Sequence, residues 1–158
     1  MIGITYLKGD ATCPQAKEEK IICNVCNDIG RWGKGFVLAL SKRWVGPESE
    51  YRKWHAAGKD AGLALGAVQF VQAEPNIWVA NMIAQRGIKR GSSTKPIRYE
   101  AVAACLTQVA SKARKLDASV HMPRIGCGLA GGDWSEIEHL IEQHMVDAGV
   151  PVYVYDFE

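Results

Sequence analysis

The stretch HMPRIGCGLAGGDW, residues 121–134, decides the fold, because it joins a short apolar run to a clear helix start. Four of the seven positions from Gly126 to Gly132 are glycine. Glycine carries no Cβ, so such a turn leaves backbone N–H groups open to the oxygens of a ligand. A tight connection between strand and helix is the alternative, but a purely structural turn rarely needs so many glycines. A strand, this turn and a helix in succession therefore predict a phosphate-binding loop.

A second glycine-rich turn, GRWGKG at residues 30–35, follows another apolar run in the same way. It differs from the P-loop pattern, because Lys34 is followed by Gly35 and not by Ser or Thr. The acidic residue of a dinucleotide fingerprint is also missing about twenty positions further on. Two such loops in one small domain predict a ligand with more than one phosphate.

Hydrophobic spacing predicts ten main elements along the chain. Alternating or continuous apolar runs indicate strands at residues 2–7, 20–25, 67–72, 77–83, 120–122 and 150–157. Helical spacing indicates helices at residues 36–45, 48–57, 99–116 and 134–148, with Gly46-Pro47 ending the first of them. The order β-β-α-α-β-β-α-β-α-β predicts an α/β fold, a three-layer α/β/α sandwich with a mixed central sheet, in one domain spanning residues 1–158.

Composition narrows the function classes further. The 47% share of apolar residues argues against disorder, and a formal charge of +2 is too small for duplex DNA or an anionic membrane. The first residues resemble a strand more than a signal peptide, and an odd count of five cysteines indicates a reducing compartment. We therefore expect a cytoplasmic monomer away from the membrane, with no metal and no cofactor.

Several polar and aromatic residues near predicted strand ends have two interpretations each. Asn24 and Asn27 could satisfy a turn or bind sugar hydroxyls, and the second interpretation is favoured for Asn27. Asp10 could cap a turn or accept a hydrogen bond from an exocyclic amine. Tyr155 shares a face with Tyr153 and could belong to the core or stack on a base.

Asp133 and the cysteines are also ambiguous. Asp133 is a carboxylate beside the glycine turn, but it fits an N-cap, with Glu136 completing a capping box. Cys127 could be a nucleophile or a small packing residue, and without a placed histidine partner packing is favoured. Cys23 and Cys26 resemble half a zinc site, yet they lie in an apolar run with no second pair, so we expect them in the core.

The segment that contains Arg86, Lys89, Arg90 and Lys95 is basic and glycine-bearing, so we expect a loop there. Such a charge cluster is usually a solvated rim. It could also steer a diphosphate or an acidic protein substrate.

Taken in this order, the motifs resemble the macrodomain family of ADP-ribose-binding modules over essentially the whole chain. GDA at residues 9–11 is similar to the family's opening motif, and NVCN at residues 24–27 falls where many members have Asn-Ala-Ala-Asn. GKGF at residues 33–36 resembles the first binding loop. MPRIGCGL at residues 122–129 is similar to the second loop of terminal ADP-ribose protein glycohydrolases, and GLAGGDW at residues 128–134 to that of DNA ADP-ribosyl glycohydrolases.

The resemblance implies that the backbones of both loops hold two phosphates, that the aspartate of GDA contacts adenine, and that Tyr155 stacks on it. It implies as partners ADP-ribose and ADP-ribosylated proteins or nucleic acids. The ligand-binding residues expected from the motifs and their surroundings are Asp10, Ala11, Asn24, Asn27, Gly33, Lys34, Gly35, Phe36, Arg86, Gly126, Cys127, Gly128, Leu129, Ala130 and Tyr155.

Two positions depart from the glycohydrolase pattern. Those enzymes have a catalytic lysine just after the strand ending here at Ile83, where this chain has Ala84-Gln85-Arg86. The terminal ADP-ribose protein glycohydrolases also have an aspartate directly after Gly-Leu, where this chain has Ala130. A lysine-independent hydrolase would need a water held by Asn27 and Gln85, with Asp133 or Asp28 as the base. We therefore expect hydrolysis of ADP-ribose esters of acidic side chains. A non-catalytic ADP-ribose reader and an ADP-ribose 1″-phosphate phosphatase are the alternatives.

Overall fold

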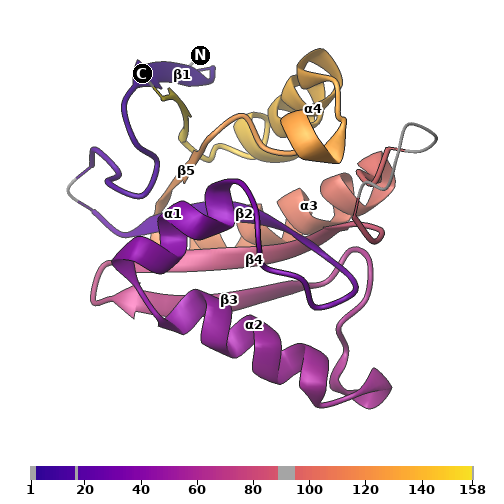
Figure 1. Cartoon of the computed structure of the whole chain (residues 1–158). Coiled ribbons are helices and arrows are strands. Elements are labelled where there is room, and N and C mark those ends of the chain that lie inside the picture. The colour runs from indigo at the N-terminus through magenta and orange to yellow at the C-terminus, as the bar shows by residue number, and fades with distance from the viewer. Residues whose placement is uncertain (1–2, 17, 89–94, 158) are drawn as a thin grey trace.

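The computed structural model describes residues 3–16, 18–88 and 95–157. Its six strands form one sheet (Figure 1). They are β1 (Thr5–Lys8), β2 (Lys20–Asn27), β3 (Val68–Glu74), β4 (Ile77–Gln85), β5 (Ser119–Met122) and β6 (Val152–Asp156). Their order across the sheet is β1-β6-β5-β2-β4-β3. Only β3 runs antiparallel to its neighbour, so the sheet is mixed, as predicted.

The main helices occupy the predicted places between the strands. They are α1 (Phe36–Arg43), α2 (Gly46–Ala56), α3 (Tyr99–Leu116) and α4 (Trp134–Ile141), which continues into a π-helical turn, η3 (Glu142–Val146). Short 3₁₀ turns, η1 (Lys59–Ala61) and η2 (Gly128–Ala130), lie in the connections. None of the helices in the described ranges is long and apolar enough to cross a bilayer.

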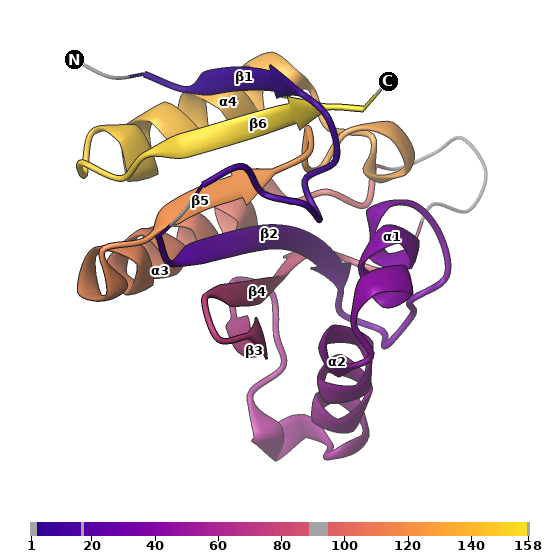
Figure 2. The same ribbon diagram turned by 90° about the vertical axis from the view of Figure 1, so that its left-hand side faces the viewer.

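The helices cover both faces of the sheet and make the three layers (Figure 2). On one face, buried side chains of α1 and α2, such as Leu40 and Tyr51, pack on Ile22 and Val79. On the other face, α3 and α4 form a larger core with the sheet. The predicted α/β/α sandwich is therefore confirmed.

The central strand β2 explains why its sequence is almost continuously apolar. It lies between β5 and β4 with both faces covered, and Ile21, Ile22 and Cys23 are fully buried. Cys26 is buried on the same strand, and burial raises the pKa of both its thiol and that of Cys23. The prediction that these two cysteines belong to the core is confirmed.

The boundaries differ from prediction in a few places. Pro47 lies in the first turn of α2 and does not end the preceding helix by itself, because proline is accepted where the backbone N–H would be unpaired anyway. The first strand begins at Thr5, and residue 2 of its predicted range lies outside the described residues. The strand predicted at 77–83 extends to Gln85 through pairing with β2.

The sheet order determines which connections meet. The carboxyl ends of the five parallel strands lie along one edge, where ligands of open α/β sheets bind. At one end of this edge, the Gly9 N–H donates a hydrogen bond to the Asp156 carbonyl. The loop after β5 comes next, followed by the end of β2 and by Gln85 at the end of β4.

Candidate functional site

Two adjoining cavities open at this edge. The first, here the inter-loop cavity, has a volume of about 300 Å³ and lies between the two glycine-rich loops. Its lining includes eight of the predicted ligand-binding residues, namely Asn24, Lys34, Gly35, Phe36, Gly126, Cys127, Gly128 and Ala130.

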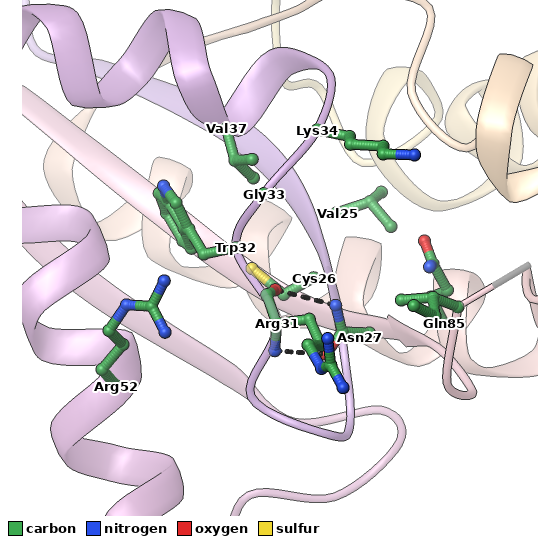
Figure 3. A pocket seen from close by; sticks show the side chains of 11 residues that line it. Val25, Cys26, Asn27, Arg31, Trp32, Gly33, Lys34, Val37, Arg52 and Gln85 are labelled. Atoms are coloured by element: carbon green, nitrogen blue, oxygen red, sulfur yellow. Dashed lines mark hydrogen bonds between the residues drawn. The ribbon is translucent and has the colours of Figure 1, made fainter.

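The second, here the distal cavity, has a volume of about 390 Å³ and is lined by residues of β2, its following loop, α1, α2 and the end of β4 (Figure 3). Asn27, Gly33 and Gln85 are among them. The two cavities share four lining residues, namely Val25, Lys34, Val37 and Gln85, and therefore form one continuous crevice.

Two glycines of the second loop, Gly126 and Gly132, are required by its own packing. A Cβ on Gly126 would lie 2.6 Å from Cδ1 of Ile137, and one on Gly132 would lie 2.3 Å from the carbonyl oxygen of Gly126. The Gly132 N–H also donates to that oxygen at 2.7 Å. The tight-turn interpretation is therefore correct for these two glycines.

Gly33 in the first loop has no such internal reason to be glycine. A Cβ there would meet nothing within 4 Å, and its φ angle is not in the left-handed region. Gly35 and Gly128 also face open space, although their φ angles of 82° and 65° favour glycine. Gly35 and Gly128 leave the inter-loop cavity free, and Gly33 leaves the adjoining part of the distal cavity free. This suits a ligand lying against exposed backbone amides.

Asn27 is committed to its own loop. Its side-chain oxygen accepts hydrogen bonds from the backbone N–H groups of Ile29 and Arg31, both at 3.0 Å. The Tyr51 hydroxyl lies 2.9 Å from this oxygen and 2.7 Å from the Asn27 carbonyl oxygen, and its one proton is shared between them. The Asn27 side-chain nitrogen donates to the Arg31 carbonyl at 2.8 Å. Turn chemistry is therefore shown, and only one N–H of the amide is left for a sugar hydroxyl, a contact that stays a prediction.

Asn24 is oriented by a ladder of amides that crosses the sheet. The Asn81 side-chain nitrogen donates to the Pro47 carbonyl at 3.1 Å, and its oxygen accepts from the Asn24 nitrogen at 3.0 Å. A carbonyl can only accept, so both amide orientations are determined. The second N–H of Asn24 meets the Cys26 sulfur at 3.4 Å, which leaves the Asn24 oxygen for a donor in the inter-loop cavity.

Sequence reasoning missed Asn81, although a signal was present. Asn81 is a single polar residue within the apolar run IWVANMIA and is fully buried. A buried amide needs partners, so its presence on a central strand indicates a hydrogen-bonding neighbour on the next strand.

Gln85 keeps the position predicted for it. Among the described residues, its side chain makes one hydrogen bond, from the nitrogen to the Gly87 carbonyl at 2.9 Å. The side-chain oxygen therefore remains available to a water or hydroxyl in the distal cavity. Nearby, the Asp28 carboxylate accepts from the Gly87 N–H at 2.7 Å but does not line either cavity.

Asp133 does not join this group. Its carboxylate accepts from the backbone N–H of Ser135 at 3.0 Å as the N-cap of α4, and it lines neither cavity. The capping interpretation of Asp133 is therefore confirmed, and this placement does not support the catalytic role expected for it. The capping box is also incomplete, because the Asp133 N–H donates to the Tyr99 hydroxyl at 3.0 Å, where Glu136 was expected.

Tyr155 is not the exposed stacking surface that we expected. It is 2% exposed, and its hydroxyl accepts from the Gln15 N–H at 2.8 Å. The ring is enclosed by the segment after β1, where Gly9 and Gln15 lie beside it, and by the His121 ring at a centroid distance of 5.7 Å. Phe157, two residues further on, is 80% exposed and follows directly on the strand end that is bonded to Gly9.

Asp10 forms the turn predicted as one of its alternatives. One carboxylate oxygen accepts from both the N–H and the hydroxyl of Thr12, at 2.8 and 2.7 Å, so the second oxygen remains for an amine. Ala11 is buried beside it. Arg86 is exposed and lies outside both cavities, and Lys89 and Arg90 lie outside the described residues.

The crevice is cationic. The distal cavity is lined by Arg31, Lys34 and Arg52, and the inter-loop cavity by Lys34 and Arg124. Arg52 is paired with Glu48 and Arg124 with Asp156, but the described lining residues themselves include no Asp, Glu or His. Burial raises the pKa of the Cys127 thiol, and the sulfur donates to the Ile125 carbonyl. The site therefore suits an anionic ligand, and its one lining thiol beside the glycines is held in the protonated form.

Comparison with known proteins agrees with this geometry. Residues 23–141 match the family model described as Macro domain, so the chain belongs to the macrodomain family, as predicted. A structure of a macrodomain protein from Streptomyces coelicolor is 55% identical, with a TM-score of 0.84 over 97% of this chain and 98% of that one.

Two curated relatives are more distant. The mouse chromodomain-helicase-DNA-binding protein 1-like is 35% identical over 98% of this chain, which spans only 18% of that protein's length. The bovine ADP-ribose glycohydrolase OARD1 is 27% identical over 96% of this chain and 90% of its own length.

Proposed function

We propose that this chain binds ADP-ribose along the crevice and hydrolyses the ester between its distal ribose and an acidic side chain of a protein. The order of the strand ends supports one ligand direction. Adenine lies at the edge formed by Asp10 and Phe157, the pyrophosphate lies in the inter-loop cavity, and the distal ribose lies beside Asn27 and Gln85.

The observation that carries the proposal is the unfilled space over Gly35 and Gly128, on the two loops that line the inter-loop cavity. Helix α1 begins at Phe36, so the first amides of that helix are directed at this space and favour a phosphate. The similarity to OARD1, named an ADP-ribose glycohydrolase, supports the reaction.

Hydrolysis requires a water near the anomeric carbon. The free side-chain oxygen of Gln85 and the remaining N–H of Asn27 would hold it. Neither group is a strong base, so the water would add late, after the bond to the leaving group has begun to break.

A reader of ADP-ribose is the second candidate. The lack of carboxylate and imidazole among the described lining residues favours it, and so does the buried Ala84 where the resembling hydrolases have lysine.

The deciding experiment incubates the protein with glutamate-linked, serine-linked and nucleobase-linked ADP-ribose, alongside calorimetry with free ADP-ribose. We expect binding together with release from glutamate alone. Binding without release from any substrate would establish the reader, and a flat titration would contradict both candidates.

A further inference from the structure

The reacting end of the ligand can be placed from the sheet order. This inference rests on the proposed function, in which adenine lies at the β1–β6 edge and the pyrophosphate lies beside β5. The distal ribose then lies at the ends of β2 and β4. The inter-loop cavity continues there into the distal cavity across Lys34 and Gln85. The group attached to that ribose must therefore enter the distal cavity.

We propose that Arg31 and Arg52 form a subsite in the distal cavity for the carboxylate that leaves the ribose, and that Arg31 is a catalytic residue. Both side chains line this cavity, one from the loop after β2 and one from α2 (Figure 3). They are 21 positions apart in sequence, and the packing of α2 on the sheet brings them to the same opening.

Both backbone polar groups of Arg31 are hydrogen-bonded to one side chain, that of Asn27. The Asn27 side chain accepts from the Arg31 N–H at 3.0 Å and donates to its carbonyl at 2.8 Å. Among the described residues, no carboxylate lies within ion-pair distance of the Arg31 guanidinium. Asn27 thus presents an uncompensated cation at the rim of the cavity.

The Arg52 side chain is oriented by hydrogen bonds to Glu48 and to the Gly30 carbonyl. Its Nε donates to Glu48 at 2.9 Å, and one of its terminal nitrogens lies 3.5 Å from the Gly30 carbonyl. Glu48 is itself held by the Ser41 hydroxyl at 2.9 Å. The other terminal nitrogen of Arg52 remains for an anion in the cavity, although Glu48 weakens its charge, so Arg31 is the stronger contributor.

The chemistry explains how the site works without a base. The bond between the anomeric carbon and the ester oxygen breaks, and its electron pair leaves with the carboxylate. A glutamate side chain has a pKa of about 4.3, so it departs as an anion and needs no proton. Water then forms the new bond to the anomeric carbon and releases its proton to solvent. The Arg31 guanidinium, carried on a backbone that Asn27 holds in place, stabilises the charge that develops on the departing carboxylate.

The same cavity is poorly suited to a nucleic acid acceptor. Binding of unpaired nucleotides normally uses an accessible aromatic ring for stacking. The aromatic residue here, Trp32, is 5% exposed, packs on Tyr51 and donates its indole N–H to Ser41 at 2.8 Å. The acceptor class is therefore a carboxylate of a protein.

The test measures hydrolysis of a peptide bearing glutamate-linked ADP-ribose by the wild-type chain and by Arg31→Gln, Arg31→Lys and Arg52→Gln. We expect Arg31→Gln to lower kcat about 100-fold, with the affinity for free ADP-ribose within about twofold of wild type. Arg52→Gln should have a smaller effect, and Arg31→Lys should keep an intermediate kcat. The matched control is Arg43→Gln, which removes one exposed arginine outside both cavities and should hydrolyse at the wild-type rate.

A second measurement separates leaving-group stabilisation from a structural effect. ADP-ribose esters of carboxylic acids with graded acidity are hydrolysed by wild type and Arg31→Gln. The loss in the variant should shrink as the acid becomes stronger, because a better leaving group needs less stabilisation.

This inference would be overturned if the wild type hydrolysed the ester and Arg31→Gln did so at the same rate. It would also be overturned if Arg31→Gln lost the same factor in rate for every ester. Either outcome would leave the proposed function intact. Release of nucleobase-linked ADP-ribose that depends equally on Arg31 would overturn the restriction to carboxylates. Binding without any wild-type release would overturn the proposed hydrolysis and the inference together.

Discussion

The hydroxyl of Tyr155 lies 2.8 Å from Nδ1 of His121 in the interior of the sheet. The Gln15 N–H donates to this hydroxyl, and among the described residues its own proton has no acceptor other than His121. Nδ1 therefore accepts, and the ring proton is on Nε2, which donates to the Ser119 hydroxyl at 2.8 Å. A neutral histidine thus links β5 to β6 and, through Gln15, to the segment that carries Asp10.

This neutral histidine predicts a pH dependence of stability. Burial first, and then the charge of Lys20, lower the pKa of His121 to about 4, below its unfolded value of about 6.5. The unfolded chain binds a proton first as the pH falls, so the stabilising contribution is complete above about pH 6.5 and is lost toward pH 4. We expect the free energy of unfolding to drop by about 2 kcal/mol between about pH 7 and pH 4.5.

Urea unfolding of wild type and His121→Asn at both pH values measures this drop. The variant is less stable throughout but should lack this part of the slope, while contributions from carboxylates cancel between the two chains. The same slope in both chains would contradict the assignment.

Asp133→Ala tests the N-cap. Loss of the bond to the Ser135 N–H should lower the free energy of unfolding by about 1 kcal/mol. The affinity for ADP-ribose and the rate of ester hydrolysis should stay at wild-type values, because Asp133 lines neither cavity. Thermal unfolding, calorimetry and the hydrolysis assay measure the three quantities. A lost rate with intact affinity and folding would return Asp133 to the catalytic group.

The order of the helices and strands was predictable from the sequence, because the apolar residues of each element follow the spacing of its buried face. Asn27 shows the limit of that reasoning. Its turn chemistry was a correct alternative, but its third partner, Tyr51, comes from a helix that sequence spacing cannot place beside it. Arg31 and Arg52 carried no pattern at all, since only the packing of α2 brings them together. Tyr155 was misjudged because alternation indicates which face a residue is on, but not that the segment carrying Gly9 and Gln15 folds over that face.

Phe157→Ala tests the adenine edge. Removing this 80% exposed ring should weaken ADP-ribose binding about 10-fold, since stacking on a base contributes about 1–3 kcal/mol. Calorimetry with ADP-ribose and with AMP measures the loss, which should be similar for both ligands because both contain adenine. The control is Val45→Ala, which removes another strongly exposed apolar side chain, away from both cavities, and should leave binding unchanged. Equal affinities of Phe157→Ala and wild type would place adenine elsewhere.

Gly33→Glu tests the first loop, where Gly33 lines the distal cavity beside Lys34, which lines both cavities. Because a Cβ at Gly33 meets nothing within 4 Å and its φ angle is not left-handed, the variant should fold with a stability within about 0.5 kcal/mol of wild type. A carboxylate there, two positions from Gly35 of the inter-loop cavity, would fill space beside the distal ribose and repel the neighbouring pyrophosphate at a cost of several kcal/mol. The affinity for ADP-ribose should therefore fall at least ~100-fold. Gly3→Glu is the matched control, because Gly3 also faces open space with an ordinary φ angle and lies outside both cavities. Calorimetry and thermal unfolding of both variants separate binding from folding. If Gly33→Glu bound ADP-ribose as tightly as Gly3→Glu, the phosphates would not lie against the first loop.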